Sequence, residues 1–222
     1  MDTVSIHYTI TAPTWRANLD NFRRKYLPGG APTTRVRALW STEEGGVRNA
    51  ELGYGMASAV RGISRYLSWW QANNISPDDG HAFYWGSDIS NQTGGTSMDQ
   101  DMPLLHNFVG DNALIEVLQN KSTFAASAGF ESYEFAVGGN DKRVLSGFVA
   151  DGTGSVPLSS VTLNLAAWAG RRVSVSAYRI GNQGPQTLAV TPASVVAGPS
   201  VSVNVSTTLA GVDAVLFLVG AE

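Results

Sequence analysis

The stretch Thr34–Gly46, TRVRALWSTEEGG, decides the fold of the first half of this 222-residue chain. Its first part, up to Trp40, is rich in residues that favour a β-strand. Two adjacent carboxylates, Glu43 and Glu44, follow and are closed off by two glycines. The pattern predicts a strand with both acids at its C-terminal end, where α/β folds place their chemistry. The alternative is that the two acids only stabilise the positive N-terminal end of a following helix.

The segments on either side of this stretch alternate between strand and helix patterns. Upstream, residues 4–10 alternate apolar and polar side chains, which predicts a strand; its polar face carries His7, which either lines a pocket or faces water. Pro13 opens a helix with one apolar stripe that ends at a Pro-Gly-Gly sequence. Downstream, a longer apolar stripe from about Val47 predicts a second helix. The short run 81-HAFYW-85 then predicts another strand.

The second half of the chain has a different pattern. The first half ends with a predicted helix over about residues 111–118. Its alternation of strands and helices implies parallel strands joined by helical crossovers. From about Ser122, short strand-like runs are separated by Gly, Pro, Asn and Asp turns, which indicates an antiparallel β-sandwich. The runs cover residues 133–137, 143–150, 161–165, 172–180, 187–190, 201–205 and 212–219. We therefore predict two domains, an α/β segment over 1–121 and an all-β sandwich over 122–222.

Composition excludes several functional classes. The formal net charge of -3 and the absence of a basic run argue against nucleic acid or an anionic membrane as partners. The chain has no cysteine, so disulfides, thiolate ligands and a thiol nucleophile are excluded, while the cellular compartment stays open. No stretch approaches the roughly 20 apolar residues of a membrane span, and the first residues lack a signal-peptide pattern. No metal-ligand, phosphate-loop or Gly-x-Ser-x-Gly motif occurs, so neither a metal nor a cofactor is expected.

The order of the motifs resembles the last third of the catalytic barrel of the clan A glycoside hydrolases, retaining enzymes built on a (β/α)8 barrel. In that clan the sixth strand often carries a His-Tyr element, and His7 and Tyr8 match it. The seventh strand ends in the nucleophile within a Thr-Glu-x-Gly element, which the sequence Thr42–Gly45 matches. The eighth strand commonly carries a tryptophan beneath the sugar ring, and Trp85 matches it. An accessory β-sandwich is also common there, for example among the xylosidase-like and glucocerebrosidase-like families.

The resemblance implies a role for each matching residue. Glu43 would be the nucleophile of a retaining glycosidase that needs no cofactor. His7 and Tyr8 would hold the charge of that carboxylate or bind sugar hydroxyls. Trp85, together with Trp40, would offer an apolar face to the C–H groups of the sugar. For the aromatic residues the alternative role is core packing.

Retaining hydrolysis also needs a second carboxyl group about 5 to 5.5 Å from the nucleophile. In the clan this general acid/base lies on the fourth strand, usually after an asparagine; the matching region would precede Met1, and the chain contains no Asn-Glu pair. Adjacent strand residues point to opposite faces, so Glu44 is not expected to share one bond with Glu43. Asp88, after the next strand, is a better local candidate, although its expected role is to bind a sugar hydroxyl.

Two classes of function follow from the sequence. The expected one is a retaining glycoside hydrolase, or a truncated portion of one, with strands six to eight of the barrel. The alternative is a non-catalytic carbohydrate-binding or structural β-sandwich with a barrel remnant. The sandwich half contains one tryptophan, Trp168, which is few for the aromatic platform expected of many sugar-binding modules. Because three parallel strands cannot close a barrel, their open edges predict a homo-oligomer; the alternative is a monomer in which the β-sandwich or the loop Asn91–Asp101 covers these edges.

Overall fold

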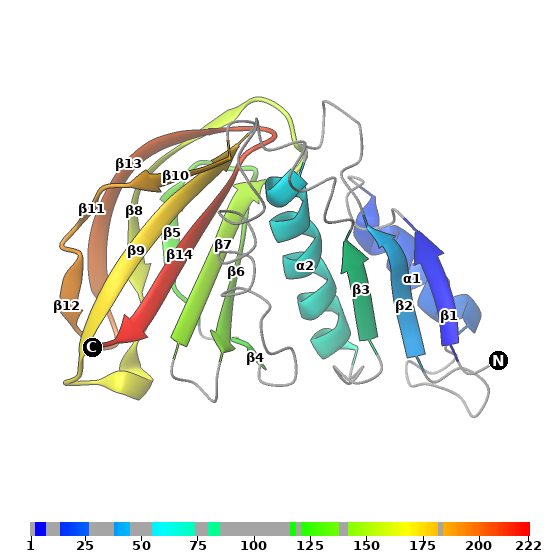
Figure 1. Ribbon diagram of the computed structural model, residues 1–222, viewed down its shortest axis with the longest axis horizontal. Helices are drawn as coiled ribbons and strands as arrows, with labels where there is room; N and C mark the ends of the chain where they lie inside the picture. The colour runs from blue at the N-terminus through cyan, green and yellow to red at the C-terminus, as the bar shows by residue number, and fades with distance from the viewer. Residues whose placement is uncertain are drawn as a thin grey trace.

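The structure is a computed structural model that describes residues 3–7, 14–26, 38–44, 55–73, 80–84, 116–118, 121–137, 142–181 and 184–222. For the three strands of its first sheet, only the backbone is described. The described part of the chain is mostly antiparallel β-sheet, accompanied by a small parallel sheet and two α-helices (Figure 1). Among these residues, no helix has the length and apolarity needed to span a membrane.

The first half forms the predicted parallel sheet. Its strands β1 (Thr3–His7), β2 (Ala38–Glu44) and β3 (Gly80–Tyr84) lie in the order β1-β2-β3, and both ladders are parallel. Helix α1 (Trp15–Tyr26) lies between β1 and β2 in the chain, and α2 (Gly55–Ala72) lies between β2 and β3. The alternation of strands and helices is confirmed.

The second half forms two antiparallel sheets. The larger has the order β10-β9-β14-β7-β6-β4, with β12 also paired to β9, and the smaller has the order β11-β13-β8-β5. A 3-10 helix, η3 (Ala166–Trp168), precedes β9. The strands are β4 (Glu116–Val117), β5 (Thr123–Ala126), β6 (Phe130–Val137), β7 (Lys142–Val149), β8 (Ser155–Leu163), β9 (Arg172–Gly181), β10 (Gly184–Leu188), β11 (Val190–Thr191), β12 (Ser194–Val196), β13 (Val201–Ala210) and β14 (Ala214–Ala221).

The helix predicted over residues 111–118 is wrong at its C-terminal end. Glu116 and Val117 form β4, which pairs with Ala136 and Phe135 of β6. Ladder hydrogen bonds to an available strand edge override a local helical preference, which is a weak determinant. Residues 111–115 lie outside the described part of the chain.

The central strands β7 and β14 of the larger antiparallel sheet are mostly buried on both faces, whereas β9 alternates buried and exposed residues. One apolar cluster fills the space between the two antiparallel sheets, and it includes Leu145, Val161 and Phe217. A second cluster joins the other face of the larger sheet to α1 and α2, and it includes Tyr66 and Phe148. Figure 1 shows the resulting order of layers, in which α2 stands between the larger antiparallel sheet and β3. Burial of both faces explains why β7 is buried at every position from Arg143 to Val149.

The second cluster crosses the predicted domain boundary. Trp15 and Leu19 of α1 and Trp69 of α2 share it with Phe135 of β6. The two predicted domains therefore have an apolar interface in common. The boundary near residue 122 stays a prediction.

Candidate functional site

The two acids of the organising stretch lie at the carboxyl end of the central parallel strand. In the ladder between β1 and β2, His7 pairs with Glu43, and in the ladder between β2 and β3, Glu44 pairs with Tyr84. The register shifts next to these residues in both ladders, between Ile6 and His7 and between Ser41 and Glu44. Irregularities of this kind are over-represented beside active sites, where they change the direction of a side chain.

The structure brings three of the predicted site residues into one small sheet. Glu43 and Trp40 belong to β2, and His7 is the last residue of β1. Because neighbouring strands lie about 4.8 Å apart, the backbone positions of His7 and Glu43 belong to one local site. Tyr8 follows β1 directly, Trp85 follows β3 directly and Asp88 comes three residues after Trp85; all three lie outside the described residues.

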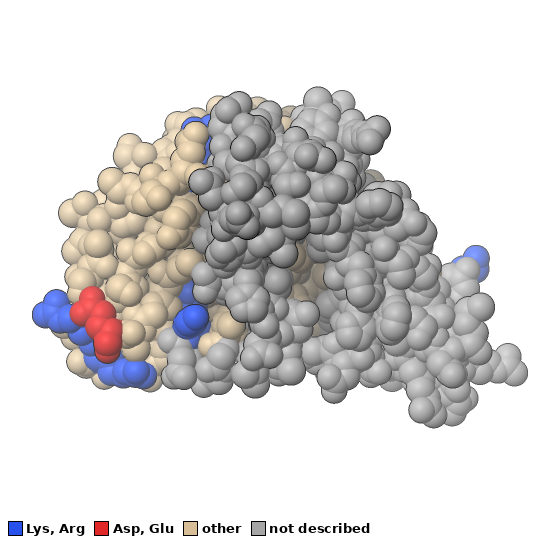
Figure 2. All heavy atoms as spheres, in the orientation of Figure 1, with Lys and Arg blue, Asp and Glu red and all other residues tan. Residues whose placement is uncertain are grey.

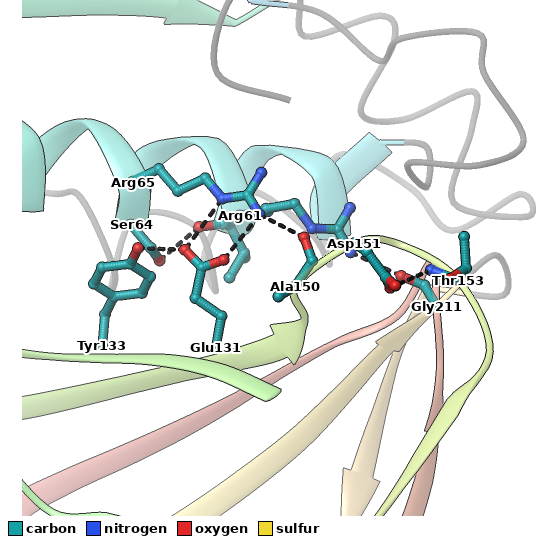
Figure 3. Close-up of polar contacts among 10 residues, drawn as sticks. Arg61, Ser64, Arg65, Glu131, Tyr133, Ala150, Asp151, Thr153 and Gly211 are labelled. Atoms are coloured by element: carbon teal, nitrogen blue, oxygen red, sulfur yellow. Dashed lines mark hydrogen bonds and ion pairs between the residues drawn. The ribbon is translucent and has the colours of Figure 1, made fainter. Parts of the chain in front are cut away.

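A buried polar network fixes α2 against the larger antiparallel sheet (Figure 3). Its centre is Arg65, whose side chain is 1% exposed. The Nε and NH2 groups of Arg65 donate to the two carboxylate oxygens of Glu131 at 3.2 and 2.9 Å, and NH2 also donates to the carbonyl oxygen of Ala150 at 2.8 Å. The guanidinium carbon lies 5.3 Å from the ring centres of both Trp15 and Phe148. The guanidinium group of Arg65 therefore packs against two aromatic rings.

Glu131 is a shared acceptor in this network. Besides Arg65, it accepts a hydrogen bond from the hydroxyl of Tyr133. Burial raises the pKa of Tyr133, and the charge of Glu131 and the hydrogen bond to it raise it further. Tyr133 therefore remains a neutral donor, and both oxygens of Glu131 already have partners. This arrangement is suited to structural support rather than to general acid/base chemistry.

A second arginine of α2 reaches the turn between β13 and β14. Arg61 donates to the carbonyl oxygen of Gly211 at 2.9 Å, and its guanidinium carbon lies 5.1 Å from the ring centre of Phe148. Burial, with a smaller contribution from the charge of Arg65, lowers the pKa of Arg61 to about 10. Arg61 therefore stays charged near neutral pH. Between the two arginines, the hydroxyls of Ser64 and Ser146 lie 2.7 Å apart.

The network was not predicted from the sequence, although one signal was available. Arg61 and Arg65 are four residues apart, so they share one face of α2 and repel each other unless acceptors surround them. That face lies beside the apolar stripe, which indicates burial. The acceptors lie in strand β6 and in two turns, 66 to 150 residues away in the sequence, and helical periodicity gives no information about them.

The network positions helix α2, which follows the strand that contains Glu43 and Glu44. Helix α2 comes next after β2 in the chain and contacts β3, β7, β9 and β14. The hydrogen bonds of Arg61 and Arg65 therefore hold α2, which also contacts β3, against the antiparallel part. Within the described ranges, no group of three or more His, Asp or Glu residues could hold a metal ion.

The chain matches no protein-family profile and no curated protein sequence. Its fold is similar to that of a glucosidase from Croceicoccus marinus, with a TM-score of 0.51 and 12% identity over 98% of this chain and 53% of that chain. A second similar structure is a bifunctional glucanase-xylanase from a metagenome library, with a TM-score of 0.45 and 14% identity over 93% of this chain and 34% of that chain. A third is a family 30 subfamily 8 xylanase from Clostridium acetobutylicum, with a TM-score of 0.43 and 14% identity over 100% of this chain and 49% of that chain.

The chain thus spans about half the length of the glucosidase that it resembles. At this level of identity, the similarity concerns the fold alone. The described residues form a β-rich fold like that of a glycoside hydrolase.

Proposed function

We propose that this chain is a retaining glycoside hydrolase, or a portion of one, that acts on a carbohydrate with Glu43 as its nucleophile. The observation that carries the proposal is the position of Glu43 at the carboxyl end of β2, paired in register with His7. The glycosidase-like fold supports the same class of reaction. The three parallel strands would then correspond to strands six to eight of a (β/α)8 barrel, followed by an accessory β-sandwich from residue 122.

In the proposed reaction, the carboxylate of Glu43 attacks the anomeric carbon and the bond to the leaving oxygen breaks. A second carboxyl group protonates that oxygen and then removes a proton from the water that cleaves the glycosyl-enzyme. His7 and Tyr8 would hold the charge of Glu43 or bind sugar hydroxyls. Trp40 and Trp85 would contact the apolar face of the sugar.

The second carboxyl group is the open part of the proposed site. Asp88 follows β3, and we propose that it binds a sugar hydroxyl rather than transferring the proton. The acid/base would come from outside the three strands, because the clan carries it on the fourth strand. The missing Asn-Glu pair favours a second candidate function, a non-catalytic carbohydrate-binding or structural protein with a barrel remnant.

Replacing Glu43 with glutamine is expected to abolish covalent labelling by a fluorinated mechanism-based glycoside and to lower hydrolysis at least roughly 100-fold, because glutamine cannot form the glycosyl ester. Peptide mapping of the labelled protein should identify the segment that contains Glu43. The matched control is Glu44→Gln, which removes the neighbouring carboxylate, leaves that of Glu43 in place and should therefore keep the label. Labelling on another residue, or unchanged hydrolysis by Glu43→Gln, would contradict the assignment.

We further propose that two copies of the chain associate through the open edges of the parallel sheet. In the described residues, β1 and β3 each pair only with β2, which leaves one edge of each strand without a partner there. A symmetric dimer is the commonest solution for identical subunits and could bring a carboxyl group of the second copy to Glu43. Light scattering over a dilution series should give a dimeric mass. A monomeric mass at micromolar concentration with an intact thermal transition would exclude a shared active site.

A further inference from the structure

We propose that a cavity along the edge of β6 binds a saccharide unit at a site separate from Glu43. The cavity has a volume of about 410 Å³, which is within the range typical of ligand sites. It is formed by side chains of α1, α2 and β6 and by the segment that precedes β5. Its described lining consists of Arg16, Ser68, Leu118, Lys121, Phe130, Glu131, Ser132, Tyr133 and Glu134.

The cavity lies where the neighbour of β6 ends. Strand β4 pairs with Phe135 and Ala136, and one further backbone hydrogen bond runs from Leu118 to the carbonyl oxygen of Glu134. Further along the same edge, the carbonyl oxygen of Ser132 accepts a hydrogen bond from Nζ of Lys121 at 2.6 Å. A side chain therefore takes the place of a paired strand, which leaves an opening beside the edge.

The charges around the cavity favour a neutral ligand with many hydroxyl groups. Arg16 and Lys121 supply two positive charges, and Glu131 and Glu134 supply two negative charges, so their formal sum is zero. A phosphate would lie beside both carboxylates, and an apolar ligand would cover Arg16 and Lys121 without offering them an acceptor, whereas Glu131 is already paired with Arg65. A hydroxyl can donate to a carboxylate and accept from a lysine or an arginine. A polyol is therefore the class of ligand that satisfies both kinds of group.

Glu134 contributes a buried carboxylate beside the cavity. Glu134 is 1% exposed, and one of its carboxylate oxygens accepts a hydrogen bond from the backbone N–H of Ser122. The other oxygen, Oε1, is buried and has no hydrogen-bond partner among the described residues. Burial raises the pKa of Glu134, while the Ser122 hydrogen bonds and the charges of Arg143 and Lys121 oppose this change. In the ladder with β7, Glu134 is paired with Leu145 and Tyr133 with Ser146, so the carboxylate of Glu134 lies on the face of β6 away from α2 and acts on the cavity through its charge.

Aromatic surface at the cavity is compatible with a sugar ring. Phe130 and Tyr133 line it, and Nζ of Lys121 lies 5.6 Å from the ring centre of Tyr133. Sugars combine a polar rim of hydroxyls with an apolar C–H face, which matches this mixed lining. The choice of a saccharide over other polyols rests on the proposed function; the preference for hydroxyl groups rests on the cavity alone.

Calorimetric titration of the full chain with xylotriose and with cellotriose tests the inference. We expect one of them to bind to wild type and to Glu43→Gln with equal affinity. Lys121→Met should weaken binding at least tenfold. Ser68→Phe, which places a ring in the cavity, should abolish binding. The matched control is Lys25→Met on the exposed end of α1, which should leave the affinity unchanged.

The variants also separate this site from the proposed active site. If Glu43→Gln loses binding while Lys121→Met and Ser68→Phe keep it, the sugar binds at the parallel strand ends and the present inference is wrong. Failure of both sugars to bind to wild type at millimolar concentration would also overturn it. Covalent labelling of Glu43 would remain possible in either case, so the two proposals can fail independently. A thermal transition recorded for each variant identifies any loss of binding that is due to unfolding.

Discussion

Replacing Gly211 with alanine is expected to lower the unfolding free energy by about 3 kcal/mol, the upper part of the usual range for overpacking. A Cβ atom at this position would lie 2.1 Å from the carbonyl oxygen of Gly152 and 2.7 Å from the backbone nitrogen of Thr153. Both atoms belong to the backbone of the turn between β7 and β8, so no side-chain rotation relieves the contact. Moving the turns apart would stretch the hydrogen bond from Gly211 to Gly154, now 2.8 Å, and the bond from Arg61.

Thermal unfolding of the Gly211→Ala variant measures this effect. For a chain of this size, a loss of about 3 kcal/mol corresponds to a decrease of roughly 6 to 12 °C in the midpoint. Gly220→Ala is the matched control, because a Cβ atom at Gly220 would meet no atom within 4 Å. Gly220→Ala should unfold close to the wild-type temperature. Equal midpoints for the two variants would show that the two turns do not approach as described.

Replacing Arg65 with methionine is expected to cost about 3 to 5 kcal/mol of unfolding free energy, as for other buried ion pairs that lose one partner. Methionine fills much of the space between Trp15 and Phe148 but donates no hydrogen bond. The carboxylate of Glu131 and the carbonyl oxygen of Ala150 would then lose the donors that now lie 2.8 to 3.2 Å away. The main penalty is the unpaired charge of Glu131, whose side chain is 20% exposed.

Chemical unfolding of single and double variants tests that origin. Adding Glu131→Gln to Arg65→Met should recover part of the loss, because glutamine is uncharged and still accepts from Tyr133. Arg172→Met is the matched control for the unfolding free energy. The side chain of Arg172 is 65% exposed, and its Nε lies 3.9 Å from Oε2 of Glu222. That pair lies at the end of the antiparallel sheets near the C-terminus, where Figure 2 shows charged side chains gathered. A similar effect of both arginine variants would contradict a special role for the buried pair.

Local periodicity predicted the elements that have one clear apolar stripe. The apolar stripe that includes Trp15 and Leu19 predicts a helix, and α1 confirms it. The strand predicted over residues 172–180 coincides with most of β9. Short strands were missed, such as β5 and β12, because three or four residues contain too little alternation to be recognised. The sequence predicts helix at Glu116 and Val117, which form β4, because their conformation depends on pairing with β6 about 20 residues later in the chain.

The candidate site was predictable only in its position along the chain. The carboxylates followed a strand pattern, and the structure has Glu43 at the end of β2. The register that pairs it with His7 depends on how two strands separated by a helix align, and neither strand contains that information alone. The charges of the β6 cavity were also not predicted, because Lys121, Glu131 and Glu134 occur in segments whose patterns only indicate strands or turns.

Burial of both faces has a consequence for how β7 keeps its alignment. In a sheet with one solvent-exposed face, a one-residue shift of a strand's register exposes apolar side chains to water and destabilises the fold. In β7, such a slip would exchange Val144 and Phe148 for Leu145 and Val149, which are equally apolar. The alignment must therefore be specified by the few positions that cannot be exchanged. Ser146 is one, since its hydroxyl meets that of Ser64 on the helix side.

Gly147 is another of these positions. The ring of Phe130 lies across it, so near that a Cβ atom there would be 2.2 Å from the tip of the ring. After a one-residue slip, the ring would collide with a larger side chain, and the hydroxyl would turn toward the apolar layer between the sheets. A serine and a glycine thus fix the alignment of β7, whose other residues from Val144 to Val149 are all apolar.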